Sequence, residues 1–160
     1  KLGSRIAIMK DGRIIQYSKP EEIVLNPADE YVRTFVAHTN PLNVLCGRSL
    51  MRTLDKCKRI NGSVCLDPGG DSWLDLAEGN TIRGARQGVN GMALQNWAPG
   101  EAVEGLERKP TLVNANIGMR EALQIRYQTG NKLVLQEGNQ VVGILGDSEL
   151  YHALLGKNLG

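Results

Sequence analysis

The order of apolar and polar positions at the start of the chain predicts a β-hairpin. Two apolar, β-prone runs, residues 5–9 and 13–17, flank Asp11 and Gly12. A tight hairpin turn needs backbone conformations with positive φ, which glycine adopts at low cost, so an Asp-Gly pair between two such runs is a strong hairpin signal. The first run shows little polar alternation, which indicates a strand covered on both faces.

Two short helices are expected after the hairpin. Pro20 suits the first position of one helix, because proline lacks the N–H that would be left unpaired there. Asn26 and Pro27 should end that helix, and Asn26 is the expected cap of the next. The apolar stripe of this second helix, which we expect to pack against a core, consists of Tyr31, Val32, Phe35 and Val36.

The chain from residue 41 to 109 predicts a β-rich meander. Pro41 marks a boundary, because the residue before a proline avoids helical geometry. Residues 49–59 form a basic segment that is helical or irregular. Turn signals then recur at short intervals. The runs between these turns are residues 63–66 and 72–76, which are read as strands, and residues 81–83 and 92–97. Residues 98–110 follow as a loop or linker.

The C-terminal part predicts the order β-α-β-β-α. A strand at 111–113 precedes a helix for which Asn116 is the expected cap. Two strands follow at 133–135 and 141–145. The apolar stripe expected on the first helix consists of Met119, Ala122, Leu123 and Tyr127.

A final helix should close the chain, capped by Asp147 or Ser148 and ending at Gly156. Its expected apolar residues are Leu150, Leu154 and Leu155. Taken with the hairpin and the meander, these elements predict the α+β fold class.

Composition is that of a globular protein. Of 160 residues, 41% are hydrophobic and 22% charged, which argues against disorder. Nineteen basic against seventeen acidic residues give a net charge of +2, too balanced for a general nucleic-acid binder. No apolar run approaches the roughly 18 residues of a membrane span, so we expect a soluble chain. Because residue 1 is lysine and a strand follows at once, we interpret the sequence as a piece of a longer protein.

The cysteines and histidines predict no metal site. Cys46, Cys57 and Cys65 are odd in number, and no pair has the two-residue gap of a zinc knuckle. Reduced thiols in a cytoplasmic setting are the simplest interpretation. His38 and His152 lie far apart in the sequence. Since no nucleophile–base pair or metal set is recognisable, we assign no catalytic residue.

The hairpin and helices resemble the end of an ABC-transporter ATPase domain. The matching residues are 5–16 (RIAIMKDGRIIQ), 20–23 (PEEI) and 26–36 (NP…YVRTFV). The resemblance is to the ATPase subunit of importers for glycine betaine, proline or choline, and residues 40–51 are most similar to choline-type members. It implies that 1–39 is a remnant of the ATPase domain, and that the parent binds ATP with its switch histidine upstream. No phosphate loop of the form GxxxxGK[ST] occurs in this chain, so we expect no ATP hydrolysis by it.

The C-terminal order resembles a CBS (cystathionine-β-synthase-type) domain. The match rests on the β-α-β-β-α pattern and on residues 142–145 (VGIL) followed by Glu149 and Leu150. Such domains usually come in pairs and follow the ATPase domain in this importer family. The resemblance therefore implies a CBS-like pair, with 41–109 as a degenerate, β-rich first unit and 110–156 as the second.

The CBS resemblance also implies a candidate nucleotide site. Members that bind a nucleotide commonly have Thr or Ser after the final strand and, three residues later, an Asp that holds the ribose hydroxyls. Here Gly146 and Glu149 occupy those positions, and Glu149 could still reach a ribose. Asp147 lies between them and is equally well explained as a helix cap. AMP or ATP binding is one alternative, and a purely structural interface is the other.

Two further groups of residues could bind ligands. The first is a basic stretch within residues 48–59. Its positive charge could attract anionic lipid headgroups or phosphates, and this attraction would weaken with salt, as an ionic-strength sensor requires. The alternative is a solvated face with salt bridges. Trp73 and Trp97 could form part of an aromatic box for a quaternary ammonium, or could pack in a core. The cations of the basic stretch, opposed only by Asp55, are Arg48, Arg52, Lys56, Lys58 and Arg59.

Two functional hypotheses follow. In the first, the chain is a regulatory tail that biases the transport cycle of an osmoprotectant importer. The parent ATPase subunit, to which the tail belongs, would lie in the cytoplasm against a membrane permease. Separated from the ATPase domain, the apolar faces of residues 1–39 would be covered by the second domain or by a second copy of the chain. We therefore expect a homodimer. In the second hypothesis, the chain is an adenine-nucleotide-binding sensor.

Overall fold

The chain begins with an antiparallel hairpin of strands β1 (Ile6–Lys10) and β2 (Arg13–Ser18). The structure is a computed structural model that describes residues 4–67 and 69–155. The hairpin turns at Asp11 and Gly12, whose φ angles of 49° and 73° are left-handed. The predicted Asp-Gly turn is therefore confirmed.

Helices α1 (Pro20–Leu25) and α2 (Glu30–Val36) follow the hairpin. Asn26 ends α1 as predicted, but its predicted role as the cap of α2 is wrong. The Asp29 carboxylate instead accepts a hydrogen bond from the Val32 N–H at 2.9 Å, so α2 begins three residues later than proline placement suggested. Val32 is the fully buried member of the predicted stripe and packs in a small cluster with Ile8 and Ile23.

The predicted meander is present as a five-stranded antiparallel sheet in which each strand pairs with the next along the chain. The 3₁₀ turn η3 (Glu78–Asn80) leads into its fourth strand. Its strands are β4 (Arg59–Ile60), β5 (Ser63–Cys65), β6 (Ser72–Leu76), β7 (Ile82–Gln87) and β8 (Asn90–Gly91).

A second five-stranded sheet has the order β3-β12-β11-β10-β9. Strands β10 and β11 run parallel, so the chain must cross over between them, and α4 makes that crossover. The strands β10, β11 and β12 with helices α4 and α5 give the predicted order β-α-β-β-α. These elements are β10 (Thr111–Asn114), α4 (Met119–Thr129), β11 (Leu133–Glu137), β12 (Gln140–Leu145) and α5 (Asp147–Leu154).

The edges of the second sheet come from the middle of the chain. Strand β3 (Arg52–Thr53) pairs with β12, and β9 (Gln95–Asn96) pairs with β10. The basic segment that precedes the meander is not one helix but a series of short pieces. They are the end of helix α3 (Gly47–Leu50), β3, and the 3₁₀ turn η2 (Leu54–Lys56), so the irregular alternative for residues 49–59 is confirmed. The 3₁₀ turn η1 (Pro41–Asn43) lies before this segment.

The second sheet is covered on both faces. Leu133 and Leu135 of β11 pack in a cluster with residues of α4 and α5, whereas Val134 between them packs in another cluster with residues of the meander. This division follows from the two-residue period of a strand, whose successive side chains point to opposite faces. The apolar run of β11 is therefore a strand buried on both sides.

Three details of the C-terminal helices differ from prediction. Helix α4 begins after Gly118, not Asn116. Met119 and Ala122 of its predicted stripe are fully buried, but Tyr127 is 92% exposed and Ile125 lies in the core instead. Gly146 is the cap position of α5, so Asp147 is its first residue. Leu150 is buried as predicted, but Leu154 and Leu155 are exposed. The expected end at Gly156 lies outside the described residues.

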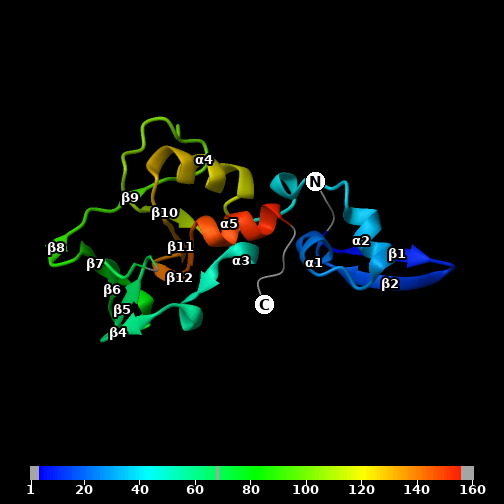
Figure 1. The fold of residues 1–160 in the computed structure, drawn as a ribbon, viewed down its shortest axis with the longest axis horizontal. Helices are drawn as coiled ribbons and strands as arrows, with labels where there is room; N and C mark the ends of the chain where they lie inside the picture. Colours follow the sequence, from blue (N-terminus) through cyan, green and yellow to red (C-terminus); the bar gives the residue numbers. More distant parts are fainter. Residues whose placement is uncertain (1–3, 68, 156–160) are drawn as a thin grey trace.

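Figure 1 shows the hairpin at one end of the molecule, the meander at the other, and the second sheet with α4 and α5 between them. Val24 and Leu25 of α1 pack against the helix-side cluster of the second sheet. The N-terminal unit thus contacts the body of the chain through α1. Within the described ranges, every helix is too short or too polar to cross a membrane.

Candidate functional site

The junction between β12 and α5 brings together the three residues predicted for a nucleotide site. Gly146 precedes α5, Asp147 opens it, and Glu149 lies in its first turn. Glu149 is buried, and its Oε2 accepts a hydrogen bond from the Gly146 N–H at 2.9 Å. Glu149, at the third position of α5, thus makes one of the two bonds of a capping box, and Gly146 has no side chain to make the reciprocal one.

Arg52 occupies the other oxygen of Glu149. Its Nη2 lies 2.7 Å from Glu149 Oε1, and β3 carries it there by pairing Arg52 with Ile144 of β12. Two residues predicted for different sites, one for anions and one for a nucleotide, therefore neutralise each other. A ribose hydroxyl could reach Glu149 only by displacing a partner that the chain already provides.

Basic side chains also lie against Asp147 and Gly146. Arg126 of α4 forms a bidentate ion pair with Asp147, with 2.6 Å from Nε to Oδ1 and 2.7 Å from Nη2 to Oδ2. A Cβ added to Gly146 would lie 2.8 Å from both Cδ and Nζ of Lys132. The flexible end of the Lys132 side chain thus lies where a Thr or Ser side chain would be.

The basic stretch is spread over several elements, and two of its five cations, Arg48 and Arg52, form ion pairs. Besides Arg52, Arg48 forms an ion pair with Glu137 of β11 and donates from Nε to Asn116 Oδ1 at 3.1 Å. The other members are Lys58, whose ammonium lies 5.8 Å from the ring centre of Trp73, Arg59, which donates to Asn80 Oδ1 at 3.5 Å, and the exposed Lys56. Contact of this stretch with anionic lipids or phosphates stays a prediction.

The cysteines are free thiols in different surroundings. Cys57 and Cys65 are buried, and Cys46 is half-buried. Burial raises the pKa of the Cys57 thiol, since the uncharged form is favoured away from water. The Cys65 thiol donates to the Asp67 carbonyl at 2.7 Å. Over residues 4–67 and 69–155, no three His, Cys, Asp or Glu side chains are grouped as a metal ion would require.

The two tryptophans lie in different sheets. Trp73 belongs to β6 of the meander, with Lys58 and Arg86 over its ring, and its indole N–H donates to the Gly70 carbonyl at 2.7 Å. Trp97 follows β9 and packs in the helix-side cluster of the second sheet. The structure therefore does not bring the two tryptophans together in one aromatic box.

A hollow beside Trp97 is the feature that the sequence did not reveal. It has a volume of about 400 Å³ and lies between residues of the 98–110 loop and the start of α4. The loop is interpreted from sequence as a linker, because it contains Pro99, Gly100 and Gly105 and has no periodic pattern. In the structure it packs onto the core through Val103 and Leu106.

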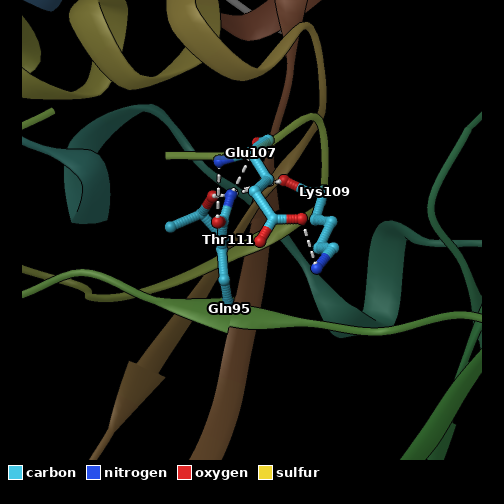
Figure 2. Close-up of polar contacts among 4 residues, drawn as sticks. All are labelled: Gln95, Glu107, Lys109 and Thr111. Carbon is cyan, nitrogen blue, oxygen red and sulfur yellow. Dashed lines mark hydrogen bonds and ion pairs between the residues drawn. The ribbon is translucent and has the colours of Figure 1, made fainter. Parts of the chain in front are cut away.

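A side-chain amide fixes this loop to the sheet. Figure 2 shows Gln95 of β9 surrounded by Glu107, Lys109 and Thr111. Its Nε2 donates to the Glu107 carbonyl at 2.8 Å, to the Lys109 carbonyl at 3.2 Å and to Thr111 Oγ1 at 3.1 Å. Its Oε1 accepts from the Glu107 N–H at 3.1 Å. The loop is therefore held in place although it has no secondary structure.

Comparison with known proteins identifies relatives over almost the whole chain. The carnitine transport ATP-binding protein OpuCA of Listeria monocytogenes is 27% identical over 172 residues, which cover 94% of this chain and 41% of the relative. The glycine betaine/proline betaine transport ATP-binding protein ProV of Escherichia coli is 29% identical over 168 residues, covering 96% and 41%. The glycine betaine transport ATP-binding protein OpuAA of Bacillus subtilis is 44% identical over 62 residues, or 39% and 15%.

The homologues of this chain are ATP-binding subunits of osmoprotectant ABC transporters. This confirms the resemblance drawn from the hairpin and helices. The chain spans about two fifths of the length of the two relatives that it matches most completely. No protein-family model matches it.

Proposed function

We propose that the chain is the C-terminal, CBS-type regulatory region of the ATPase subunit of an importer for an osmoprotectant such as choline, glycine betaine or proline. Residues 1–39 would be the end of the ATPase domain, and 41–109 and 110–156 the CBS-like region. The observation that carries this proposal is homology over 94–96% of the chain to ATP-binding subunits, which links the hairpin and both sheets to one kind of protein.

The proposed role is to modulate transport by contact, without chemistry in this chain. Regulation of this kind requires two arrangements of the region that differ in free energy and are biased by conditions. The packing of Val24 and Leu25 on the helix-side cluster offers a route, because a shift of α5 or α4 would reach α1 and hence the ATPase remnant. ATP would bind elsewhere in the parent.

The proposed partners are an upstream ATPase domain, a permease in the membrane and a second copy of the chain. The parent would lie in the cytoplasm against the membrane. Exposed apolar side chains on the N-terminal unit support a covering partner, since such surface is costly in water. They are Met9, Ile14, Tyr17 and Phe35.

The nucleotide-sensor alternative receives less support from the site. Both oxygens of Glu149 have partners within the chain, and the flexible end of the Lys132 side chain lies beside Gly146. Adenine nucleotides would have to break the pair of Arg52 and Glu149 to reach the carboxylate. Calorimetry with AMP and ATP tests this, and binding that Arg52→Ala strengthens would favour the sensor.

The regulatory proposal is tested with the full-length subunit reconstituted with its permease in vesicles. ATP-driven uptake should depend on ionic strength, and truncation after residue 39 should abolish this dependence while leaving basal uptake. An unchanged response in the truncated subunit would contradict the proposal. So would a reading frame that lacks a GxxxxGK[ST] loop upstream of this region.

A further inference from the structure

The hollow beside Trp97 has walls suited to one class of ligand. Its volume of about 400 Å³ exceeds that of a water molecule many times over. Its walls include the Trp97 ring and the apolar side chains of Val103 and Ile117. Two carboxylates, Glu101 and Glu121, also line it, and its lining contains no lysine, arginine or histidine. The combination of an aromatic residue with two carboxylates, and no basic residue in the lining, favours a cation.

The hollow is also formed before any ligand arrives. Glu101 accepts from the Ala98 N–H at 3.0 Å, and its carbonyl accepts from the Trp97 indole N–H at 3.1 Å, so the carboxylate and the ring are tied to each other. Gln95 fixes the far end of the loop, as Figure 2 shows. Gln128 of α4 holds its middle by donating to the Glu104 and Leu106 carbonyls at 3.1 and 3.3 Å. Such preorganisation lowers the entropic cost of binding.

The chemistry of the walls narrows the class of cation. A metal ion would need three or more closely grouped ligands, which the described residues do not provide. A small inorganic ion would lose part of its hydration shell against the apolar walls, which offer no ligands to replace the lost water. A quaternary ammonium keeps its charge but carries methyl groups that fit such walls and an aromatic face. A zwitterion would bring a carboxylate toward Glu101 and Glu121 and be repelled.

We propose that this hollow is a binding site for a small quaternary ammonium monocation of the size of choline. The proposal is independent of the regulatory role above, because it depends on Trp97, Glu101 and Glu121 alone. Its occupancy should weaken as salt screens the carboxylates.

Indole N–H signals in NMR spectra of the ¹⁵N-labelled chain test the site, with choline chloride titrated against sodium chloride at equal ionic strength. The Trp97 signal should shift saturably and the Trp73 signal should not, because Lys58 and Arg86 lie over the Trp73 ring. Trp73→Phe assigns the two signals. Tetramethylammonium should reproduce the shift, whereas glycine betaine and 3,3-dimethylbutan-1-ol, the neutral isostere of choline, should bind at least about fivefold more weakly.

Matched variants separate the site from a general charge effect. Glu101→Gln and Glu121→Gln should each weaken choline binding roughly two- to fivefold. Glu104→Gln removes the same charge from the same loop but not from the hollow, and should leave affinity unchanged. Glutamine at 101 can still accept from the Ala98 N–H, so an unchanged Trp97 signal in the free variant shows an intact loop. The proposal is overturned by a Trp97 signal that does not saturate, by equal binding of choline and its neutral isostere, or by equal effects of all three variants.

Discussion

Glu149 is a buried carboxylate whose charge is compensated entirely by the chain itself. Its Oε2 pairs with the Gly146 N–H and its Oε1 with Arg52, so the start of α5 and the edge strand β3 are joined at one residue. Removing a carboxylate from water costs several kcal/mol, which such contacts must offset. The pair therefore matters chiefly because neither member can be lost alone.

Replacing Arg52 by alanine should lower the free energy of unfolding. A fully buried pair would lose about 3–5 kcal/mol, but the Arg52 side chain is 40% exposed, so solvent screening reduces the expected loss to about 1–3 kcal/mol. Urea unfolding measures this. Lys56→Ala, which removes a nearby exposed cation, is the control and should change stability by less than about 0.5 kcal/mol. Adding Glu149→Gln to Arg52→Ala should restore part of the stability; a double variant weaker than Arg52→Ala would contradict the argument.

At the scale of elements, those with strong local sequence signals were predictable, whereas those that exist only through long-range pairing were not. Asp11 and Gly12 specify the hairpin because the turn demands their conformation. The strand β11 and its neighbours are recognisable because turn residues bound short apolar runs. By contrast, the two-residue strand β3 is too short to have a pattern. Strand β9 lies in the run 92–97 that the sequence assigned to the meander, but it pairs with β10 of the second sheet.

The same limit explains what the sequence missed at the candidate sites. Gly146, Asp147 and Glu149 are adjacent in the sequence, so their grouping was predictable. Arg52 reaches Glu149 only through the pairing of β3 with β12, which no local pattern encodes. The start of α4 was predicted too early because Asn116 is a good cap by residue type, yet its side chain instead accepts from Arg48.

The pairing of β3 with β12 depends on a glycine. A Cβ on Gly143 would lie 2.5 Å from Met51 Sδ and 2.9 Å from the Arg52 carbonyl, and the backbone contact cannot relax without moving β3. Gly143→Ala should therefore lower the free energy of unfolding by about 1–3 kcal/mol. Gly84→Ala, in β7, is the matched control, because a Cβ there has no neighbour within 4 Å. Thermal unfolding compares the two, and equal melting temperatures would show that β3 moves freely.

At the scale of the whole molecule, the second sheet is the centre to which everything else attaches. Helices α4 and α5 cover one face and the meander covers the other, while α1 joins the N-terminal unit to the helix side. The N-terminal unit has a small cluster of its own, centred on Ile8, Ile23 and Val32. Several of its other large apolar side chains, among them Met9, Ile14, Tyr17 and Phe35, are exposed, which makes this end of the chain the expected place of association.

Phe35 tests where copies of the chain associate. It is 63% exposed on α2, close in sequence to the buried Val32. In a symmetric dimer the same face is used twice, so Phe35→Glu should raise the dissociation constant at least about tenfold, because each copy loses the burial of a large apolar side chain. Light scattering over a range of concentrations measures the mass. Val89→Glu, at a residue 97% exposed between β7 and β8, adds the same charge at the opposite end and should leave the dimer intact. If the unmodified chain remains monomeric at the highest concentration, the dimer is refuted, since the exposed face is then stable in water by itself.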